Sequence, residues 1–351
     1  MTSICIDKRK KTRIALIGAG AIGRAHLNGA LLADNIEIVG VADPNSNSRN
    51  IALEFGVPWF SDYRDLIEKM NPEGAIVASP NELHVPIGID LVNSGVAVLV
   101  EKPISDQIED ALYLTLCADE NNVPLLVGHH RRHNKILAKA RELVASGCIG
   151  QVAIVNILAA FQKPDSYYEQ TWRKSMAGGP VLINLIHEID LIRFVCGEIE
   201  SLQAVCSNRI RNYEVEDTAA VLLKLENGAL VTITLCDATP APWNWDLSSG
   251  ESAAFPNYSC DSHYILGTKG SLTLPRLRLW SYPCEKGWHN LLQKEVLEIE
   301  NSDPYIEQIR HFGAVIRGEE KPLVTGKDAI KTLEITQAIR KSSQTGEVIY
   351  F

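Results

Sequence analysis

The chain has 351 residues, too long for one typical hydrophobic core, and its 46% of hydrophobic residues can fill the cores of two domains. The formal net charge of -9 argues against nucleic acid as a partner, because phosphates require a basic surface. No apolar stretch approaches the roughly 20 residues that span a bilayer, and the N-terminus lacks the apolar core of a signal peptide. We therefore expect a cytoplasmic protein that binds neither nucleic acid nor membranes.

The basic N-terminal run and the cysteines indicate no site. Lys8–Lys11 lies in a polar segment, which we interpret as a solvated tail before the first strand. The eight cysteines are scattered without a C-x-x-C pair and mostly lie in apolar surroundings, as small core residues in a reducing compartment do. They are Cys5, Cys117, Cys148, Cys196, Cys206, Cys236, Cys260 and Cys284. A structural metal is therefore not expected.

The first predicted strand, Ile14–Ile17, runs into three glycines spaced as G-x-G-x-x-G. In such a loop Gly18 makes a tight turn off the strand, Gly20 lets the backbone approach a diphosphate, and Gly23 lets the next helix pack closely on the sheet. A helix predicted over Ala21–Ala33 would hold the diphosphate at its N-terminus. The stretch predicts a dinucleotide site formed by Gly18, Gly20, Ala21, Ile22 and Gly23.

Asp43 follows the second predicted strand, Ile36–Val41, and stands twenty residues after Gly23 (43 minus 23). An acidic side chain there accepts hydrogen bonds from the adenosine ribose hydroxyls. The alternative is a turn former beside Pro44. Because a carboxylate repels a 2'-phosphate, the cofactor is predicted to be NAD, with NADP as the alternative if Asp43 is offset by Ser46, Ser48 or Arg49.

Three further strands alternate with helical patterns, as in a doubly wound parallel sheet, and are predicted over Ala75–Ala78, Ala97–Val100 and Leu125–Val127. Ligands gather beyond the carboxyl ends of such strands, so the dinucleotide is expected to meet Ser79, Pro80, Asn81, His84 and Glu101. A helix cap is the alternative role of Asn81. Lys102 would point towards the nicotinamide, where its ammonium can donate to a substrate oxygen or, when partly desolvated, exchange protons.

After about residue 150 the apolar runs are longer and often alternate, which indicates an open, largely antiparallel sheet. Its strands are predicted over Val152–Ala160, Leu202–Cys206, Ala219–Lys224, Leu230–Cys236, Ser262–Leu266 and Ser271–Leu274. Asn227-Gly228 between two of these runs predicts a hairpin. The principal helix is predicted over Gly178–Cys196, and the tail is predicted to be helical over Pro304–Arg317 and Lys327–Ser342.

The principal helix is apolar almost all round but carries Asn184, His187 and Asp190. Asn184 and His187 are three residues apart and are expected on one helix face. Buried polar groups without partners are costly, so this pair is either satisfied structurally or faces a site. With Lys102 and a dinucleotide motif in the same chain, we favour a site.

Together these motifs resemble the Gfo/Idh/MocA oxidoreductases, the family of glucose-fructose oxidoreductase and inositol dehydrogenase. They occur in the family's order over nearly the whole chain: Gly18-x-Gly20-x-x-Gly23, Asp43-Pro44, Glu101-Lys102-Pro103, the Gly178-Gly179 helix with His187-Glu-Ile-Asp190, and Gly267-Thr-Lys-Gly270. The resemblance implies an α/β fold with an N-terminal Rossmann domain, a doubly wound parallel sheet assigned to residues 1–131. It also implies a C-terminal substrate-binding α/β domain with an open, largely antiparallel sheet, residues 132–351, which often builds homodimers or homotetramers. Packing of the C-terminal helices back onto the Rossmann domain is compatible with this division.

The family resemblance implies hydride exchange between a nicotinamide and a carbinol carbon of a sugar, inositol or related polyol. Lys102 matches the family's lysine and His187 its proton-transferring histidine. Many members place an aspartate four residues before that histidine, where this chain has Ile183. Asn184 lies one position later and can orient substrate or His187, but it does not ionise at neutral pH.

Other predicted pocket residues rest on the same resemblance. Arg131 and Arg132 stand where the family typically carries an Arg-Arg pair, and are expected to contact cofactor and substrate respectively. The neighbouring His129, His130 and His133 lack a carboxylate or cysteine to complete a metal set. Aromatic faces suit the C–H surface of a sugar, so substrate contacts are predicted for Tyr168, Trp172 and Trp245, with a subunit interface as the alternative.

We therefore predict an NAD-dependent dehydrogenase acting on a secondary hydroxyl. Two alternatives remain: an NADPH-dependent keto or imine reductase of the same fold, and a cofactor-sensing regulator without turnover. Retention of Lys102 and His187 argues against the regulator.

Overall fold

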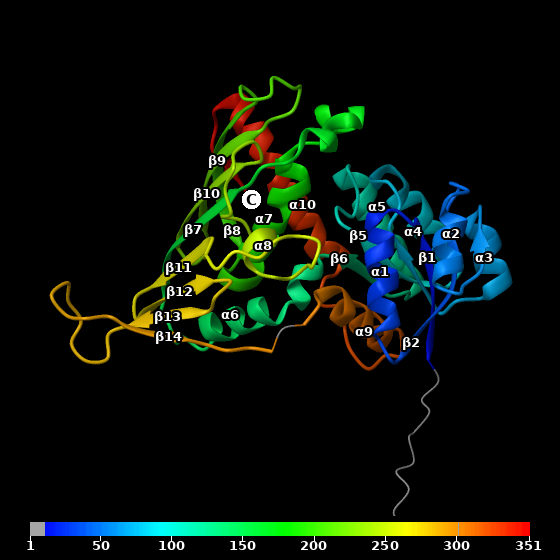
Figure 1. The fold of residues 1–351 in the computed structure, drawn as a ribbon, viewed down its shortest axis with the longest axis horizontal. Coiled ribbons are helices and arrows are strands. Elements are labelled where there is room, and N and C mark those ends of the chain that lie inside the picture. The colour runs from blue at the N-terminus through cyan, green and yellow to red at the C-terminus, as the bar shows by residue number, and fades with distance from the viewer. Residues whose placement is uncertain (1–10, 301) are drawn as a thin grey trace, which may run out of the picture. The chain divides into compact units, whose positions relative to one another are not determined.

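The computed structural model describes residues 11–300 and 302–351. Cys5 and most of the basic run Lys8–Lys11 lie outside the described residues. The chain divides into two compact units: an N-terminal unit that extends to His130 and includes Asp303–Lys331, and a C-terminal unit of Arg131–Ser302 and Thr332–Phe351. Each unit is described by itself below (Figure 1).

The N-terminal unit is built on a six-stranded sheet in the order β3-β2-β1-β4-β5-β6, in which every pair of neighbours is parallel. The strands are β1 Thr12–Ile17, β2 Ile36–Ala42, β3 Trp59–Phe60, β4 Gly74–Val77, β5 Ala97–Glu101 and β6 Leu125–Gly128. The helices between them are α1 Ala21–Leu31, α2 Ser48–Glu54, α3 Tyr63–Met70, α4 His84–Asn93 and α5 Ile108–Asn121. The doubly wound parallel sheet is confirmed. The two-residue β3 was missed, since it is too short to show a periodic pattern.

Helix α9, Pro304–Ile316, completes the core of the N-terminal unit although it lies nearly two hundred residues after β6 in the sequence. It begins at the cap residue Asp303, whose side chain accepts from the N–H of Tyr305 at 2.8 Å. Its apolar face, with Ile309 and Phe312 fully buried, joins the cluster formed by β1, β2 and α1. Figure 1 shows α9 (orange) beside α1 (blue). Gly29 on α1 permits this approach, because a Cβ there would lie 3.0 Å from Ile309 Cδ1.

The C-terminal unit contains a nine-stranded sheet in the order β14-β13-β12-β11-β7-β10-β9-β8-β15. Only β7 and β10 pair in parallel, so the predicted open, largely antiparallel sheet is confirmed. The strands are β7 Val152–Ala160, β8 Ile199–Ser207, β9 Thr218–Leu225, β10 Leu230–Cys236, β11 His263–Gly267, β12 Gly270–Leu274, β13 Arg278–Ser281, β14 Gln293–Val296 and β15 Ile349–Tyr350. The sequence analysis missed β13, β14 and β15; β14 is exposed throughout and gives no apolar signal.

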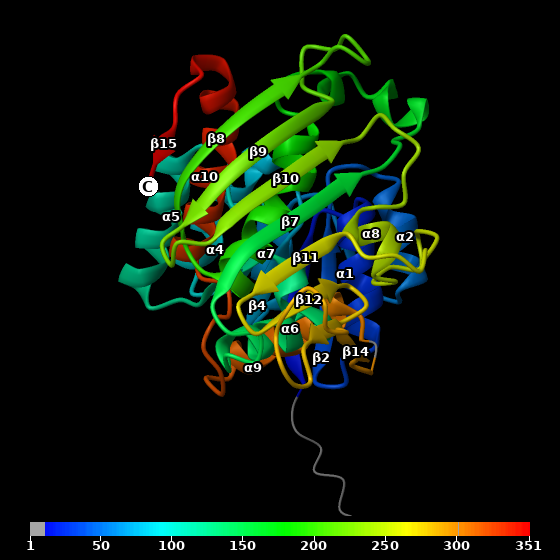
Figure 2. The ribbon, with the colours of Figure 1, turned by 90° about the vertical axis from the view of Figure 1, so that its left-hand side faces the viewer.

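One face of this sheet is buried against helices and the other is open. The helices are α6 Lys135–Ala145, α7 Ile186–Cys196, the short α8 Trp245–Ser248, and most of α10 Gly326–Thr345. Every residue of α7 is buried. Figure 2 looks onto the opposite face, where the strands run uncovered across the view. Alternate residues of β9 and β10 point to that face, and Leu222 and Leu230 are about half exposed there, at 47% and 50%.

Asn227 and Gly228 form the predicted hairpin between β9 and β10, with Gly228 at a φ of +87° that favours glycine.

Within the described residues no helix is both long and apolar enough to cross a membrane. The seven cysteines of that part of the chain are all free thiols.

Candidate cofactor and substrate sites

The glycine loop of the N-terminal unit leaves backbone surface uncovered at its centre. Gly18 has a φ of +90°, and a Cβ there would lie 2.5 Å from the carbonyl oxygen of Ala78. A Cβ on Gly23 would lie 2.1 Å from the carbonyl oxygen of Gly18, whereas one on Gly20 would meet nothing within 4 Å. Gly18 and Gly23 are therefore required by packing, and Gly20 is left for an external group. Since no side chain caps α1 at Gly20, the loop fits a diphosphate at the helix N-terminus.

Asp43 holds the glycine loop to the end of β2. Its Oδ2 accepts from the N–H of Ala19 at 2.8 Å, and its Oδ1 accepts from the N–H of Asn45 at 2.8 Å. Asp43 therefore both stabilises the turn at Pro44 and binds the glycine loop. Each carboxylate oxygen keeps a second lone pair, so Asp43, which is half-buried, has the acceptor capacity that ribose hydroxyls require. Ser48 is buried, while Ser46 and Arg49 are exposed.

His84 connects the turns that follow β4 and β5. Its Nδ1 lies 2.8 Å from the carbonyl oxygen of Pro103, and its Nε2 lies 3.0 Å from that of Ser79. Burial lowers the pKa of His84, although both carbonyl contacts oppose this. A neutral imidazole has one N–H, so one of the two contacts is a donated hydrogen bond. The geometry makes His84 a brace between two turns. Ser79 and Asn81 are half-buried beside it, and Pro80 is exposed.

Glu101 is buried beneath Lys102 and bound by His26, a residue that the sequence analysis missed. Glu101 Oε1 lies 2.7 Å from His26 Nε2, and Oε2 accepts from the backbone N–H of Lys102 at 3.1 Å. Burial would raise the pKa of Glu101, but His26, with His130 and Lys102 nearby, holds it below the usual range. Gly128 makes room, because a Cβ there would lie 2.8 Å from Glu101 Oε1. The available signal was that His26 falls on the buried face of α1.

The ring of Tyr305 lies between two histidines of this unit. His130 stacks on it with ring centroids 4.6 Å apart, and His26 meets it edge-on at 5.2 Å. Through Tyr305, the N-terminus of α9 packs against His26, which binds Glu101, and against His130. Lys102 itself is half-buried at the end of β5, next to the Lys102-Pro103 peptide, which is cis.

In the C-terminal unit Asn184 and His187 lie in different kinds of helical turn. Val181–Leu185 forms a π-helical turn, and α7 starts at Ile186. Such turns recur at functional sites. His187 is 8% exposed and Asn184 is half-buried. The helix is confirmed from residue 181 onwards, but its first turn is not the regular α-helix that the three-residue spacing assumed.

Asn184 lines a small pocket within the C-terminal unit. The other lining residues are Arg131, Ala159, Phe161, Glu188, Asn244, Trp245 and Asp246. Its volume of about 10 Å³ is roughly room for one water. By itself this pocket does not hold a sugar.

Both predicted arginines form buried ion pairs inside the C-terminal unit. Arg131 donates to Glu188 at 2.9 Å and to Asp246 at 2.8 Å. Arg132 donates twice to Asp190, at 2.9 and 2.7 Å. Burial would raise the pKa of Glu188, but His263 and Arg131 hold it at about 2. These guanidinium groups have structural partners, and their contacts with cofactor or substrate stay predictions.

The three predicted aromatic residues differ in accessibility. Trp245 is fully buried and donates from Nε1 to Glu251 at 2.8 Å, with its ring 5.7 Å from the Arg131 guanidinium. Tyr168 is 4% exposed and donates its hydroxyl to Asp237 at 2.8 Å. Trp172 is 49% exposed. Trp172 is the one of these three whose ring has a large accessible face.

Lys163 and Asp237 form a second charged group that the sequence analysis missed. Lys163 is 6% exposed and Asp237 is fully buried. Lys163 Nζ lies 2.8 Å from Asn184 Oδ1 and 3.1 Å from Asp237 Oδ2. No periodic pattern marks either residue, although Asp237, a charged residue directly after the apolar strand β10, gave a usable signal, and Lys163 follows β7 by three residues.

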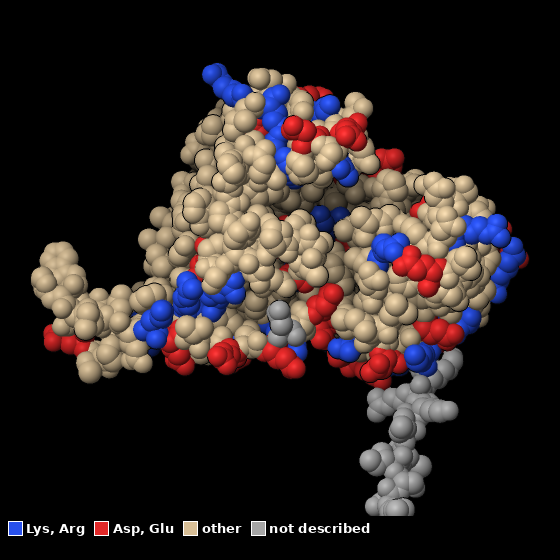
Figure 3. All heavy atoms as spheres, in the orientation of Figure 1, with Lys and Arg blue, Asp and Glu red and all other residues tan. Residues whose placement is uncertain are grey.

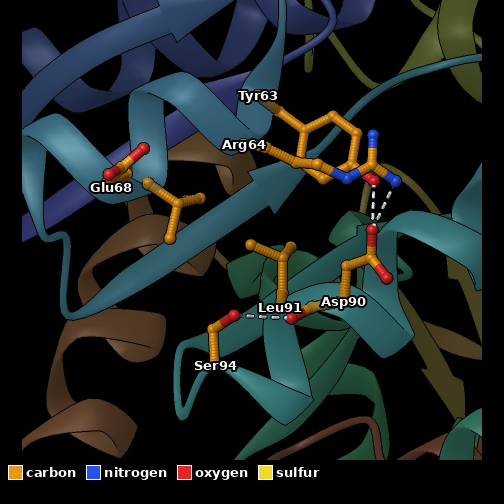
Figure 4. A pocket seen from close by; sticks show the side chains of 7 residues that line it. Tyr63, Arg64, Glu68, Asp90, Leu91 and Ser94 are labelled. Carbon is orange, nitrogen blue, oxygen red and sulfur yellow. Dashed lines mark hydrogen bonds and ion pairs between the residues drawn. The ribbon is translucent and has the colours of Figure 1, made fainter.

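Two other surface features lie apart from the predicted residues. A pocket of about 220 Å³ lies between α3 and α4 (Figure 4). Asp90 lines it and accepts from the Tyr63 hydroxyl at 2.5 Å and from Arg64 at 2.7 Å. None of the predicted site residues lines it. On the described part of the face drawn in Figure 3, basic and acidic side chains are interspersed and form no extended basic patch.

Comparison with known proteins gives the family. Residues 12–129 match the oxidoreductase family model with an NAD-binding Rossmann fold, and residues 137–273 match the GFO/IDH/MocA C-terminal domain. The chain belongs to the Gfo/Idh/MocA oxidoreductase family. This member is therefore an NAD-binding oxidoreductase with a small-molecule substrate.

Two relatives align over almost their full length with this family member. It is 25% identical over 342 residues to 1,5-anhydro-D-fructose reductase of Ensifer adhaerens, covering 95% of this chain and 97% of that protein. It is 25% identical over 342 residues to myo-inositol 2-dehydrogenase of Thermotoga maritima, covering 94% and 96%. The WlbA dehydrogenase from Bordetella pertussis, solved with NADH and UDP-GlcNAcA, shares the fold with a TM-score of 0.78 at 23% identity, covering 97% of this chain and 99% of that one.

Proposed function

We propose that this oxidoreductase is an NAD-dependent dehydrogenase that converts a secondary hydroxyl of a sugar, inositol or related polyol to a ketone. The observation that carries the proposal is the glycine loop with its open Gly20 face together with Lys102, whose backbone Glu101 holds at the end of β5. Two nearly full-length relatives named for an anhydro-sugar and an inositol support the substrate class.

The chain's own residues would divide the work as follows. The N-terminus of α1 and the loop Gly18–Gly23 would hold the diphosphate, and Asp43 would accept from the adenosine ribose. The nicotinamide supplies the hydride acceptor when bound. His187 would take the hydroxyl proton, while the Lys102 ammonium donates to the same oxygen and stabilises the negative charge that develops there. Asn184 would orient the substrate.

Asp43 supports NAD over NADP, since a carboxylate that accepts from the adenosine ribose would repel the like charge of a 2'-phosphate. The competing proposal, reduction of a ketone or imine with NADPH, requires Arg49 or the serines Ser46 and Ser48 to offset Asp43. The two differ in which reduced cofactor binds more tightly.

We also propose that the protein self-associates in the cytoplasm through the open face of the nine-stranded sheet. The half-exposed Ile154, Leu222 and Leu230 on that face favour this, since contiguous apolar surface marks interaction sites. Light scattering coupled to gel filtration would give the mass: a dimer or tetramer supports self-association, and a monomer overturns it.

The decisive experiment measures NADH and NADPH binding to the purified protein, then follows the absorbance of reduced nicotinamide with sugars, inositols and their keto forms. Tighter NADH binding with turnover of one polyol class is the expected result. NADPH preference with turnover only of keto compounds would favour the reductase. Tight cofactor binding without any turnover would overturn the substrate assignment.

A further inference from the structure

Lys163 has no role in the function proposed above, yet it is almost completely buried beside Asn184. It lies three residues after β7 and is 6% exposed. Lysine is almost never buried to this extent unless it is paired, because transferring an ammonium out of water is costly. Its surroundings therefore have to account for its charge.

Lys163 shares its carboxylate partner with a second cation, and its ammonium also faces the ring of Tyr167, whose centroid lies 4.7 Å from Nζ. Asp237 Oδ2 lies 3.1 Å away, but Asp237 also pairs with Arg211 and accepts from Tyr168 at 2.8 Å. Two cations thus share one carboxylate. Burial lowers the pKa of Lys163, Asp237 opposes this, and Arg211 and Arg173 lower it further.

Asn184 supplies a second acceptor, and that contact decides the direction of its amide. An ammonium group only donates, so the atom that faces Lys163 Nζ at 2.8 Å has to be the carbonyl oxygen Oδ1. The amide nitrogen Nδ2 then points away from Lys163 and can only donate. Asn184 also lines the small pocket that Trp245 and Asp246 border.

We propose that Lys163 is a positioning residue that fixes Asn184 as a hydrogen-bond donor towards an oxygen of the substrate. The substrate group met by Asn184 is therefore an acceptor: a hydroxyl, ring or carbonyl oxygen. A carboxylate in place of Asn184 could only accept and would select a donor instead. This inference rests on the proposed polyol chemistry for its substrate, but its first step does not.

The first test needs neither substrate nor cofactor. The side-chain amide of Asn184 is observed by NMR in protein labelled with ¹⁵N-asparagine and is assigned through its loss in N184A. Its shift should change with pH as Lys163 titrates, below the ordinary lysine pKa, and this change should vanish in K163M. The control K139M removes a lysine of α6 that pairs with Glu142 near the surface and should keep the change. A pH response that persists in K163M overturns the proposed contact.

The second test uses the polyol that the wild type turns over. K163M and N184A should each raise KM about tenfold with a smaller change in kcat, as expected for one lost hydrogen bond. The double variant should be no worse than either single one, because Lys163 acts through Asn184. N184D retains a partner for Lys163 but loses the donor, so it should also raise KM and serves if K163M does not fold.

The outcomes separate the two proposals. If the KM increases of K163M and N184A multiply in the double variant, Lys163 does not act through Asn184. A wild-type KM in N184D likewise overturns the proposal. A positive NMR result with no turnover of any polyol leaves the Lys163–Asn184 contact supported and overturns the substrate class instead.

Discussion

The candidate sites of the two units are formed by different kinds of chemical group. In the N-terminal unit the site is mainly backbone: a glycine loop, a helix N-terminus and the turns after β4 and β5. In the C-terminal unit it consists of buried side-chain charges, among them Arg131 with Glu188 and Lys163 with Asp237. A backbone site can bind a ligand without being needed for stability, whereas a buried charge network contributes to the fold itself. Changes at Gly20 and Lys102 in the first unit should therefore reduce binding or turnover, whereas breaking the buried pairs of Arg131 in the second should reduce stability.

Lys102→Met should have the largest effect. We expect turnover to fall by roughly 10²–10³-fold, the range for losing a donor that stabilises a developing negative charge, while NADH binding stays within about twofold. Steady-state rates and NADH fluorescence titration measure the two quantities. Lys69→Met, which changes an exposed side chain of α3, is the control and should change neither. A K102M enzyme with the wild-type rate would remove Lys102 from the mechanism.

Arg131→Met should reduce stability, because the carboxylates of Glu188 and Asp246 both lose their ion pair with the buried guanidinium. Removing one partner of a buried pair typically costs about 3–5 kcal/mol. Urea unfolding measures the loss. The exposed pair Arg64–Asp90 provides the control, since Arg64→Met removes an ion pair that solvent screens and should change stability little. Unchanged stability with lost NADH binding would show that the guanidinium serves the cofactor after all.

Acid should destabilise the protein partly through Glu188. Its pKa is about 2 when folded, against 4.5 for the free side chain, so the stabilisation is complete above pH 4.5 and is lost as the pH falls towards 2. The difference amounts to about 3 kcal/mol. Glu188→Gln should unfold more easily at pH 7 but show a shallower loss of stability between pH 4.5 and 2. Parallel pH curves for both proteins would contradict this assignment.

Gly20→Ala tests the backbone site. A Cβ at Gly20 meets nothing within 4 Å, so the melting temperature should change little, while the methyl group should weaken NADH binding by about tenfold or more where the diphosphate approaches. Gly56→Ala is a contrast: its φ of +68° makes the substitution cost about 1 kcal/mol without affecting NADH. Unaltered NADH affinity in G20A would mean that the cofactor does not cross this loop.

Asp43→Asn should have the smallest effect. The single amide oxygen can still accept from the N–H of Ala19, so the loop contact should hold, but the amide nitrogen cannot accept from the N–H of Asn45 and that turn contact is lost. The charge that disfavours a 2'-phosphate is removed at the same time. We expect NADH to bind several-fold more weakly and its preference over NADPH to shrink by about tenfold. Paired titrations with both cofactors measure this. An unchanged preference would place cofactor selectivity on other residues.

Prediction from sequence succeeded where short-range geometry decides the structure. The spacing of Gly18, Gly20 and Gly23 after an apolar run indicates a strand, a tight turn and a helix within a dozen residues. Alternation in β9 and β10 likewise indicated strands with one buried face, and Asn227-Gly228 the hairpin that joins them. Asn184 was visible as a polar residue in an apolar helix, and its role in a site stays a prediction. Its π-helical turn was not foreseen, because a single shifted hydrogen bond leaves no periodic trace.

The sequence by itself determined the class of fold, the glycine loop between β1 and α1 and the position of Lys102 after β5, because each follows from backbone rules that act over a few residues. Only the tertiary structure decided which charges pair. Arg131 meets Glu188 and Asp246 from 57 and 115 residues away, and Glu101 meets His26 from 75 residues away. The physical reason is that the free energy of burying a charge depends on every group around it, and those groups come together only when distant segments pack.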